Sequence, residues 1–385
     1  MLSSHIGLGH AARDAALVEA MKKLLPGIEA YACTAEPALS YLRRRGVEPL
    51  PGCEEMKSLT PIVEQMYNKP MGLLAARHAT EILEHNYKVL GRALSGSGVF
   101  DLIIADEYWE LIYRGPRGPL MESVFVTDFL GFPTPRNPLK KLVIERINRY
   151  IAERLARLPR LYYAGYENDV PREHRWLLRR RETRILGGLP SYPWISTTRE
   201  EARKHLGLEG EKTIITIING GTAAAAKRFL ERALCLVKRS GLGDTATVLV
   251  VTGPRTREKP RHYEGIDLVW VGYTPVIVDY IVAADLIISR AGRTSIADIE
   301  CANRPAILVP IKGHPEQEHL ARAAQERNPV LRAVPENRLC GEDAMRTLHE
   351  LIGAPRTTPQ GACDNVLRAA RTILLETGLL SRRSN

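Results

Sequence analysis

Residues 285–318 constrain the fold of this chain more than any other segment. The apolar run 285–288 predicts a buried strand that stops at the turn Ser289–Gly292. An amphipathic helix is predicted from about Arg293, and a second apolar run, 306–310, follows before a polar loop. Strand, glycine-containing turn, helix and strand form a βαβ unit, and such units place ligands beyond the carboxyl ends of their strands. The segment therefore predicts an α/β fold with a ligand site near this turn.

The predicted start of the helix, at Gly292, Arg293 and Thr294, suits a phosphate group. Free backbone N–H groups and the positive end of the helix dipole both favour an anion there. Asp298 lies one helical turn further on, where its carboxylate could accept hydrogen bonds from a sugar diol. These residues predict a binding site for a phosphate-containing ligand.

Length and composition set broad limits on the class of protein. A chain of 385 residues favours two domains, and a content of 44% hydrophobic and 25% charged residues is typical of a globular protein. No run of about 18 apolar residues occurs, which argues against a transmembrane helix. The first residues lack the basic and then apolar segments of a signal peptide.

The cysteines and the net charge suggest a compartment and a class of partner. The six cysteines are scattered singly without a C-x-x-C pair, so we expect no zinc knuckle, no disulfide framework and a reducing compartment. The net charge of +10 and the pI of about 9.3 favour anionic partners, such as phosphates, an acidic membrane surface or nucleic acid.

Strands and helices alternate in both halves of the chain, which predicts an α/β fold of two doubly wound, Rossmann-like domains. Leu189–Pro193 is the best linker candidate, so we expect an N-terminal domain over 1–188 and a C-terminal domain over 189–365. A final segment, 366–385, is expected to form a helix and a tail that pack back on the first domain. Two such domains joined by a short linker imply a cleft between them.

The first glycine-containing loop carries Gly7, Gly9 and His10, and a helix is predicted over 10–25. The glycines let the backbone approach a ligand closely. The helix dipole is expected to lower the pKa of His10 and keep its side chain neutral, so that it could act as a base. A plain glycine turn with a capping histidine explains the pattern equally well. Only Met1 and Leu2 precede this loop, so either the first strand is very short or the reading frame begins too late, and we favour a true start upstream.

Two further loops follow predicted strands in the second half. The strand 213–218 leads into a loop of Asn219, Gly220, Gly221 and Thr222. This loop could wrap a diphosphate with backbone N–H groups, although an ordinary turn has the same pattern. Neither glycine loop matches a P-loop or a G-x-G-x-x-G dinucleotide site. Gly272 and Tyr273 end another strand and could contact a nucleotide base, although Tyr273 taken singly fits the core or its rim better.

Carboxylates end two predicted strands of the first half. Asp106 and Glu107 follow one strand, and Asp128 follows another. Such side chains could serve as a general base or bind an acceptor hydroxyl. Capping of the next helix is at least as good an explanation for each.

A basic amphipathic helix is predicted over 139–158. Its apolar face, which includes Leu142 and Val143, is expected to belong to the core. Its basic side could rest on anionic lipid headgroups, although a solvated helix face is the simpler interpretation.

Taken together, these residues resemble the GT-B glycosyltransferases of family 28. The loop Gly7–His10 is similar to the family's Gly-Gly-His loop, and Ser289–Gly292 followed by Asp298 is similar to its Arg-Ser-Gly turn and ribose-binding acid. Gln317 and Glu318 are similar to a Gln-Gln pair that contacts the donor sugar. The sequence departs from the family where Asp298 replaces Glu, where Glu318 replaces the second Gln, and where Arg293 adds a cation.

The resemblance implies a glycosyltransferase that moves a sugar from a nucleotide-diphosphate donor, a UDP-sugar, to a hydroxyl acceptor, for which a lipid-linked molecule is one expectation. The second half would bind the donor, and the first half the acceptor, with His10, Asp106 or Asp128 as the base. We expect no cofactor and no metal. We also expect a cytoplasmic protein, with peripheral contact at the inner face of the membrane. The implied donor-site residues are Gly7, Gly9, Asn219, Gly220, Gly221, Thr222, Gly272, Tyr273, Ser289, Arg290, Gly292, Arg293, Thr294, Asp298, Glu316, Gln317 and Glu318.

Two other classes of protein fit parts of the same pattern. A nucleotide-sugar hydrolase or 2-epimerase of the same fold would share the donor site and differ in the first half. A nucleic-acid-binding protein would explain the net charge and the basic segment 172–184, but the aromatic interleaving and reader motifs of such proteins are missing.

Overall fold

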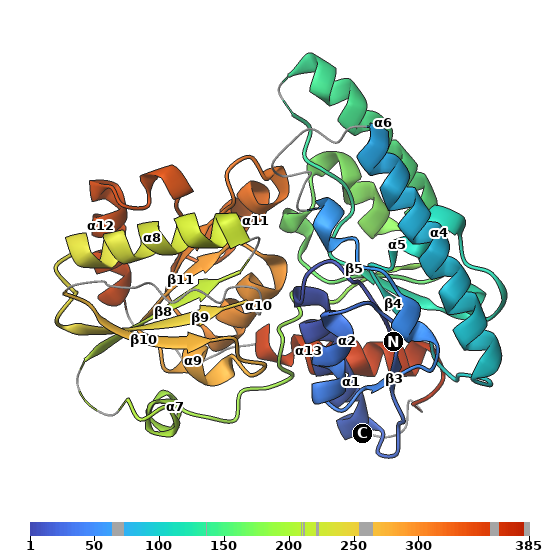
Figure 1. Cartoon of the computed structure of the whole chain (residues 1–385), viewed down its shortest axis with the longest axis horizontal. Helices are drawn as coiled ribbons and strands as arrows, with labels where there is room; N and C mark the ends of the chain where they lie inside the picture. The colour runs from blue at the N-terminus through green and yellow to red at the C-terminus, as the bar shows by residue number, and fades with distance from the viewer. Residues whose placement is uncertain are drawn as a thin grey trace. The chain divides into compact units, whose positions relative to one another are not determined.

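The computed structural model divides the chain into two compact units (Figure 1). The first comprises Met1–Pro193 with Asp364–Asn385, and the second comprises Trp194–Cys363, whereas the sequence predicted boundaries at 188/189 and 365/366. The structure describes residues 1–63, 73–135, 137–208, 210, 212–220, 223–253, 265–354 and 362–380. Gly221 and Thr222 of the predicted donor loop lie outside these ranges.

The first unit is built on a parallel sheet with the strand order β1-β4-β5-β6-β7. A small parallel sheet of β2 and β3 continues it, because Leu2 of β1 also pairs with Cys33 next to β2. The strands are β1 (Leu2–Ser3), β2 (Tyr31–Ala32), β3 (Glu48–Pro49), β4 (Ile104–Asp106), β5 (Val124–Thr127), β6 (Leu161–Tyr163) and β7 (Thr183–Ile185). This order places the first strand in the middle, as in a doubly wound fold.

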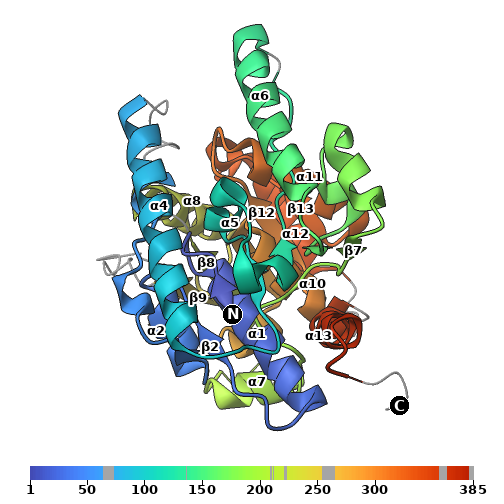
Figure 2. The same cartoon turned by 90° about the vertical axis from the view of Figure 1, so that its right-hand side faces the viewer.

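Alternation along these strands divides the core of the first unit into two layers. Phe125 points to the layer of α4, α5 and α6, whereas Val124 and Val126 point to the layer of α1 and α13. The helices are α1 (Gly9–Leu24), α2 (Ala38–Arg44), α4 (Leu73–Gly96), α5 (Trp109–Arg114), α6 (Pro138–Leu155) and α13 (Asn365–Glu376). The last helix therefore packs in the first unit, against α1 (Figure 2).

The second unit has a parallel sheet in the order β10-β9-β8-β11-β12-β13. Its strands are β8 (Thr213–Asn219), β9 (Ala246–Thr252), β10 (Asp267–Gly272), β11 (Leu286–Arg290), β12 (Ala306–Val309) and β13 (Leu331–Ala333). Its helices are α7 (Arg199–His205), α8 (Ala223–Arg239), α9 (Val278–Val282), α10 (Arg293–Ala302), α11 (Pro315–Arg327) and α12 (Glu342–Ile352). The chain builds β9 and β10 on one side of β8 and then returns to its other side with β11, so the order reverses between β8 and β11.

The polar segment after β12 is a helix rather than the predicted loop. Glu316, Gln317 and Glu318 lie in the first turn of α11, which has Pro315 at its first position. His314 is the N-cap residue, and its side chain accepts a hydrogen bond from the backbone N–H of Gln317. The prediction of a loop missed a helix start with proline just inside it and acidic residues in the first turn.

The six cysteines form three disulfides, so the prediction of no disulfide framework is wrong. The bonded pairs are Cys33–Cys53, Cys235–Cys340 and Cys301–Cys363. The partners are 20, 105 and 62 residues apart, and their Cα atoms lie 4.5–5.7 Å from each other. Spacing along the sequence could not reveal pairs that the fold brings together over such separations, and a reducing compartment no longer follows from the cysteines.

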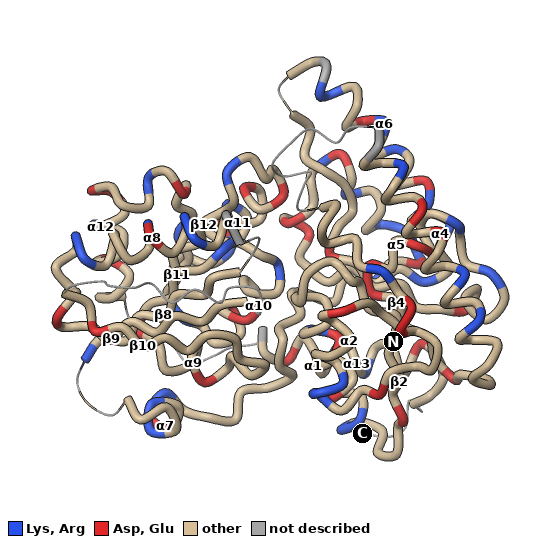
Figure 3. The backbone as a smooth tube through the Cα atoms, in the orientation of Figure 1, with Lys and Arg blue, Asp and Glu red and all other residues tan. Residues whose placement is uncertain are grey.

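The first turns of α6 extend beyond the sheet of the first unit in both views (Figures 1 and 2). Leu142 and Val143 are 60% and 57% exposed, so the expectation that they belong to the core is wrong. Ile151 and Leu155, further along the helix, are buried. Basic residues run along the helix beside the exposed pair (Figure 3). In the described part of the chain, no helix has both the length and the apolar character needed to cross a membrane.

Candidate functional site

Arg13 of α1 joins the carboxyl ends of β4 and β5 in the first unit. Its Nε donates a hydrogen bond to Asp106 Oδ2 at 2.6 Å, and its Nη2 donates to Asp106 Oδ1. Its Nη1 donates to Asp128 Oδ2. His10 lies one turn earlier, with Nδ1 at 3.2 Å from Asp106 Oδ1. The fold thus gathers His10, Asp106 and Asp128, the three residues named from the sequence, around an arginine that had been given no role.

These groups do not cap helices. The N-cap of α1 is Leu8 and that of α5 is Tyr108, and neither has a side-chain capping bond. Asp106 and Asp128 are instead brought together because β4 and β5 are neighbours in register. Burial acts to raise the pKa of Asp106, but Arg13 and His10 outweigh burial and hold this pKa well below its usual range.

His10 does not have the lowered pKa that the helix dipole was expected to cause. Burial and the Arg13 cation do lower the pKa of His10, but the Asp106 and Glu107 carboxylates outweigh them and raise it to about 9. A pKa near 9 favours the protonated ring at neutral pH, so this environment does not favour the neutral His10 expected of a base. The prediction failed because partners from β4 could not be seen in the local sequence.

Glu107 completes this cluster. Its Oε1 accepts hydrogen bonds from Thr127 Oγ1 at 2.8 Å and from the Asp128 backbone N–H at 3.1 Å. Its Oε2 lies 3.8 Å from His10 Nε2. Its backbone has a φ of +42°, a left-handed conformation that side-chain-bearing residues rarely adopt. Burial and the Asp128 carboxylate raise the pKa of Glu107 to about 8, against the opposing cations of His10 and Arg13.

A second buried network, which the sequence analysis did not predict, supports the glycine loop. The Leu59 N–H donates to His5 Nδ1 at 3.0 Å, so His5 Nε2 carries the proton and donates to Glu110 Oε1 at 2.8 Å. Asn86 Nδ2 donates to the same carboxylate oxygen at 2.8 Å. Gly7, with a φ of +73°, donates its N–H to Thr60 Oγ1 at 3.2 Å. The loop before His10 is thus fixed by α4 and α5.

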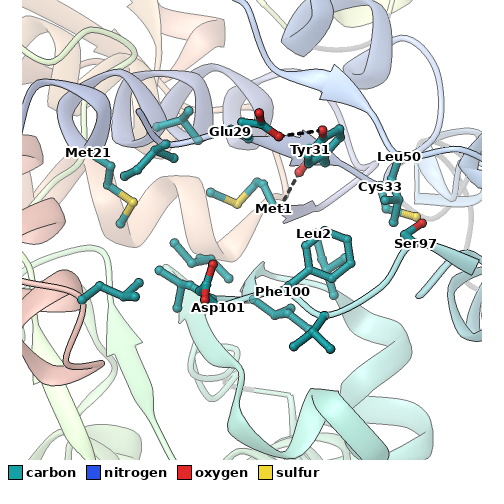
Figure 4. Close-up of a pocket in the computed structure, with 18 of the residues that line it drawn as sticks. Met1, Leu2, Met21, Glu29, Tyr31, Cys33, Leu50, Ser97, Phe100 and Asp101 are labelled. Carbon is teal, nitrogen blue, oxygen red and sulfur yellow. Dashed lines mark hydrogen bonds between the residues drawn. The ribbon is translucent and has the colours of Figure 1, made fainter. Parts of the chain in front are cut away.

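A cavity of about 860 Å³ in the first unit lies away from this cluster. It opens at the amino ends of the strands, where Met1, Tyr31 and Asp101 line it (Figure 4). His10 and Asp106 lie at the opposite, carboxyl ends of the strands. The cavity is therefore not part of the predicted site.

In the second unit, the predicted donor loops meet where the strand order reverses. Ile218 of β8 pairs with Ser289 of β11, so Asn219 and the turn after β11 begin side by side. Asn219 is 1% exposed, and within the described part of the chain its Nδ2 and Oδ1 have no hydrogen-bond partner. Unpaired buried amides are rare in folded proteins, because desolvation of each polar atom is costly. A buried, unsatisfied amide at this position indicates a place for a polar ligand.

The start of α10 has the predicted form. Gly292 is its N-cap, with no side-chain capping bond, and Arg293 and Thr294 follow in the first turn. Helix α10 has 10 residues, enough for backbone N–H groups and a dipole that favour an anion at its start. Asp298 is buried one turn further along this helix.

Arg290, one of the implied donor-site residues, is held by partners inside the second unit. Its Nη1 donates to Glu336 Oε2 at 2.7 Å, and its Nη2 donates to the Ala225 carbonyl at 2.7 Å. The guanidinium also lies 4.5 Å from the centre of the Phe229 ring. Arg290 is buried, and these contacts link β11 to α8 and to the segment before α12. Glu336 neutralises its charge. The sequence placed it correctly at the strand end but could not show this partner.

The remaining donor-site candidates occupy two other strand ends. Gly272 has a φ of +72° at a bulge in β10, which explains the glycine, and Tyr273 beside it is half-buried. At α11, the Gln317 Oε1 accepts from the Ile311 N–H at 3.0 Å, and the Glu318 Oε1 accepts from the Gly313 N–H at 3.3 Å. These two oxygens therefore shape the loop before α11.

Comparisons with known proteins agree with this geometry. The sequence profile of the glycosyltransferase family 28 C-terminal domain matches residues 215–343. Two bacterial UDP-N-acetylglucosamine–N-acetylmuramyl-(pentapeptide) pyrophosphoryl-undecaprenol N-acetylglucosamine transferases are similar in sequence. The one from Desulforudis audaxviator is 30% identical over 45% of this chain and 48% of its own length. The one from Desulforamulus reducens is 27% identical over 43% and 47%. The chain thus spans about half the length of the curated relatives it matches.

Solved structures extend the likeness to the whole fold. The glycosyltransferase SnogD from Streptomyces nogalater has a TM-score of 0.56 at 15% identity, over 98% of each chain. The glycotransferase of kitacinnamycin has a TM-score of 0.58 at 13% identity, over 96% of this chain and 93% of its own. At such low identity the likeness shows the fold alone, which is the two-domain GT-B fold.

Proposed function

We propose that this chain, which has the GT-B fold and matches the family 28 C-terminal domain over residues 215–343, transfers a sugar from a nucleotide-diphosphate donor to a hydroxyl acceptor. The second unit binds the donor, a UDP-sugar, and the first unit binds the acceptor. The transfer uses no metal ion and no cofactor.

The observation that carries the donor half of this proposal is the unsatisfied amide of Asn219 beside the start of α10. The amide offers a donor and an acceptor to a polar ligand, and the helix start favours the negative charge of a diphosphate. As the sugar leaves, the electron pair of the broken C–O bond goes to the diphosphate, and the helix dipole stabilises that charge. Of the two arginines among the implied donor-site residues, Arg290 is paired with Glu336, so we assign this role to Arg293.

The acceptor half of the proposal rests on the cluster around Arg13 in the first unit. The acceptor oxygen must lose its proton as it bonds to the anomeric carbon, so a proton-accepting group must lie at the acceptor site. The cluster places the carboxylates of Asp106, Glu107 and Asp128 at the ends of β4 and β5, with His10 of α1 beside them.

A lipid-linked acceptor at the inner face of a membrane fits the surface of α6. Leu142 and Val143 are exposed beside Lys140, Lys141 and Arg146, so the helix could insert apolar side chains while its cations meet anionic headgroups. The names of the sequence relatives also mention a pyrophosphoryl-undecaprenol, which is a polyprenyl-linked molecule. We propose peripheral contact there, with the rest of the protein on the cytoplasmic side.

Donor binding is the first test. We expect calorimetry to show that UDP-sugars bind, that EDTA leaves the affinity unchanged, and that Asp298→Ala weakens binding about tenfold or more, since a hydrogen bond to a charged group contributes about 1.5–3 kcal/mol. Asp343→Ala, on the exposed face of α12 in the same unit, is the control and should bind normally.

The outcomes separate the competing functions. A transferase should release UDP slowly until a polyprenyl-diphosphate-linked sugar is added. Fast hydrolysis without an acceptor would identify a nucleotide-sugar hydrolase instead, and epimerised sugar would identify a 2-epimerase. Failure of every nucleotide sugar to bind would contradict the proposal as a whole, and unchanged affinity in the Asp298 variant would remove only that residue from the site.

A further inference from the structure

Glu107 follows the last residue of β4 in a left-handed backbone conformation. A φ of +42° is costly for a residue with a side chain, yet the strand end of β4 adopts it at this position. The result is a carboxylate with one oxygen fixed and the other directed at a neighbour. Thr127 and the Asp128 N–H hold Oε1, and Oε2 faces His10 Nε2 across 3.8 Å.

The other groups of the cluster are poorly suited to take a proton. Both oxygens of Asp106 accept hydrogen bonds from Arg13, and Arg13 also bonds Asp128. Protonation of either carboxylate would weaken a buried ion pair. His10 Nδ1 lies 2.9 Å from Arg13 Nη2 and 3.2 Å from Asp106 Oδ1, and a pKa of about 9 favours the protonated ring at neutral pH.

We infer that Glu107 is the general base of the proposed transfer and takes the proton of the acceptor hydroxyl. The inference rests on the proposed function and deepens it. In the step, the acceptor oxygen bonds to the anomeric carbon, the bond from that carbon to the diphosphate oxygen breaks, and the acceptor proton moves to Glu107 Oε2. An acceptor oxygen within hydrogen-bond distance of both Oε2 and His10 Nε2 would fit, because 3.8 Å is too long for a direct bond and short enough for one oxygen to bridge.

The charges around Glu107 support this role. The groups that face it are His10 and Arg13 from α1, Asp106 on its own strand and Asp128 at the end of β5. Burial and Asp128 raise its pKa to about 8, while the two cations oppose that shift. A base is most effective when its pKa lies near the working pH, because it is then both available and strong enough.

The first test is the pH dependence of turnover. Wild-type kcat for transfer from the UDP-sugar selected by calorimetry, with a polyprenyl-diphosphate-linked sugar as the acceptor, should rise with pH, reach half of its maximum near pH 8 and level off above it. Glu107→Gln, which keeps the shape of the side chain, should lower kcat about a hundredfold or more and remove this rise, while donor affinity stays unchanged. Glu122→Gln, an exposed glutamate of the same unit, is the control.

His10→Gln separates Glu107 from the histidine. Loss of the His10 cation should raise the pKa of Glu107, so the rise of kcat should persist and move to higher pH. If His10→Gln abolishes the rise and Glu107→Gln keeps it, His10 is the base and the inference is wrong. A purely structural role for Glu107 would lower stability in Glu107→Gln and leave the pH profile in place.

A spectroscopic test needs neither donor nor acceptor. In protein labelled with ¹³C at the glutamate carboxyls, one signal should titrate near pH 8 and disappear in Glu107→Gln. Absence of that signal would overturn the inference even if the protein proves to be a transferase. Its presence in a protein that binds no nucleotide sugar would show that the proposed function had failed, while the unusual titration of Glu107 was real.

Discussion

Arg13 is the residue whose removal should most damage the first unit. Its guanidinium is buried and bonds Asp106 and Asp128, so replacement leaves two carboxylates without their counter-charge. We expect Arg13→Met to lower the free energy of unfolding in urea by about 3–5 kcal/mol, the usual cost of breaking a buried ion pair from one side. The exposed pair Arg77–Glu81 provides the control, since Arg77→Met should cost less than about 1 kcal/mol.

A second substitution tests the cause of that loss. Adding Asp106→Asn to Arg13→Met removes one uncompensated carboxylate, so the double variant should recover part of the lost stability. If the two substitutions are instead additive, the cost of Arg13→Met comes from lost packing and not from unpaired charge.

Helix α13 is held at its first residue, Asn365, by a close contact with the chain at Gly187. Asn365 Nδ2 donates to the Gly188 carbonyl at 3.0 Å and to the Tyr166 hydroxyl at 3.2 Å. Gly187, beside it, has a φ of +79°, and a Cβ there would lie 2.7 Å from Asn365 Nδ2. The chain returns here from the second unit, and this close approach anchors it in the first unit.

We expect Gly187→Ala to loosen α13, since the new methyl group must displace Asn365. The loss of stability should be about 2–4 kcal/mol, and hydrogen exchange should speed up in α13. Gly46→Ala isolates the contact, because Gly46 has a similar φ of +74° with no atom within 4 Å of a Cβ, and it should cost only about 1 kcal/mol. Equal effects of the two substitutions would mean that backbone strain, not the contact, explains the loss.

The elements also show where reasoning from sequence reached its limit. Helix α10 begins at Arg293, where the sequence predicted a helix start, because the glycine turn before it and its amphipathic spacing are local signals. Local signals also indicated Asn219, Gly292 and the strand-end acids as candidate site residues. The partners that decide their chemistry are distant, as with Arg13 and Asp106, 93 residues apart, or Arg290 and Glu336, 46 apart. The raised pKa of His10 and the buried ion pair of Arg290 follow from such partners, so the local sequence could not predict them.

At the scale of the whole molecule, the disulfides act within units. Cys33–Cys53 lies in the first unit, and Cys235–Cys340 and Cys301–Cys363 lie in the second. Cys363 is the last residue of the second unit, and Cys301 belongs to α10, the helix whose start is the proposed diphosphate site. The third bond therefore ties the end of that unit to its proposed ligand helix.

We expect a reducing agent to lower the melting temperature of the protein in calorimetry. Each bond restricts the unfolded chain, and the entropy model assigns about 3–5 kcal/mol to loops of these lengths. Replacing Cys33 and Cys53 with alanine should lower the melting temperature of the first unit. Replacing Cys235 and Cys340 with alanine should lower that of the second unit. Each double variant should lose less than the wild type when reductant is added, because one bond is already gone. Six reactive thiols in the untreated protein, or a melting temperature that reductant leaves unchanged, would show that these bonds do not hold the native fold in solution.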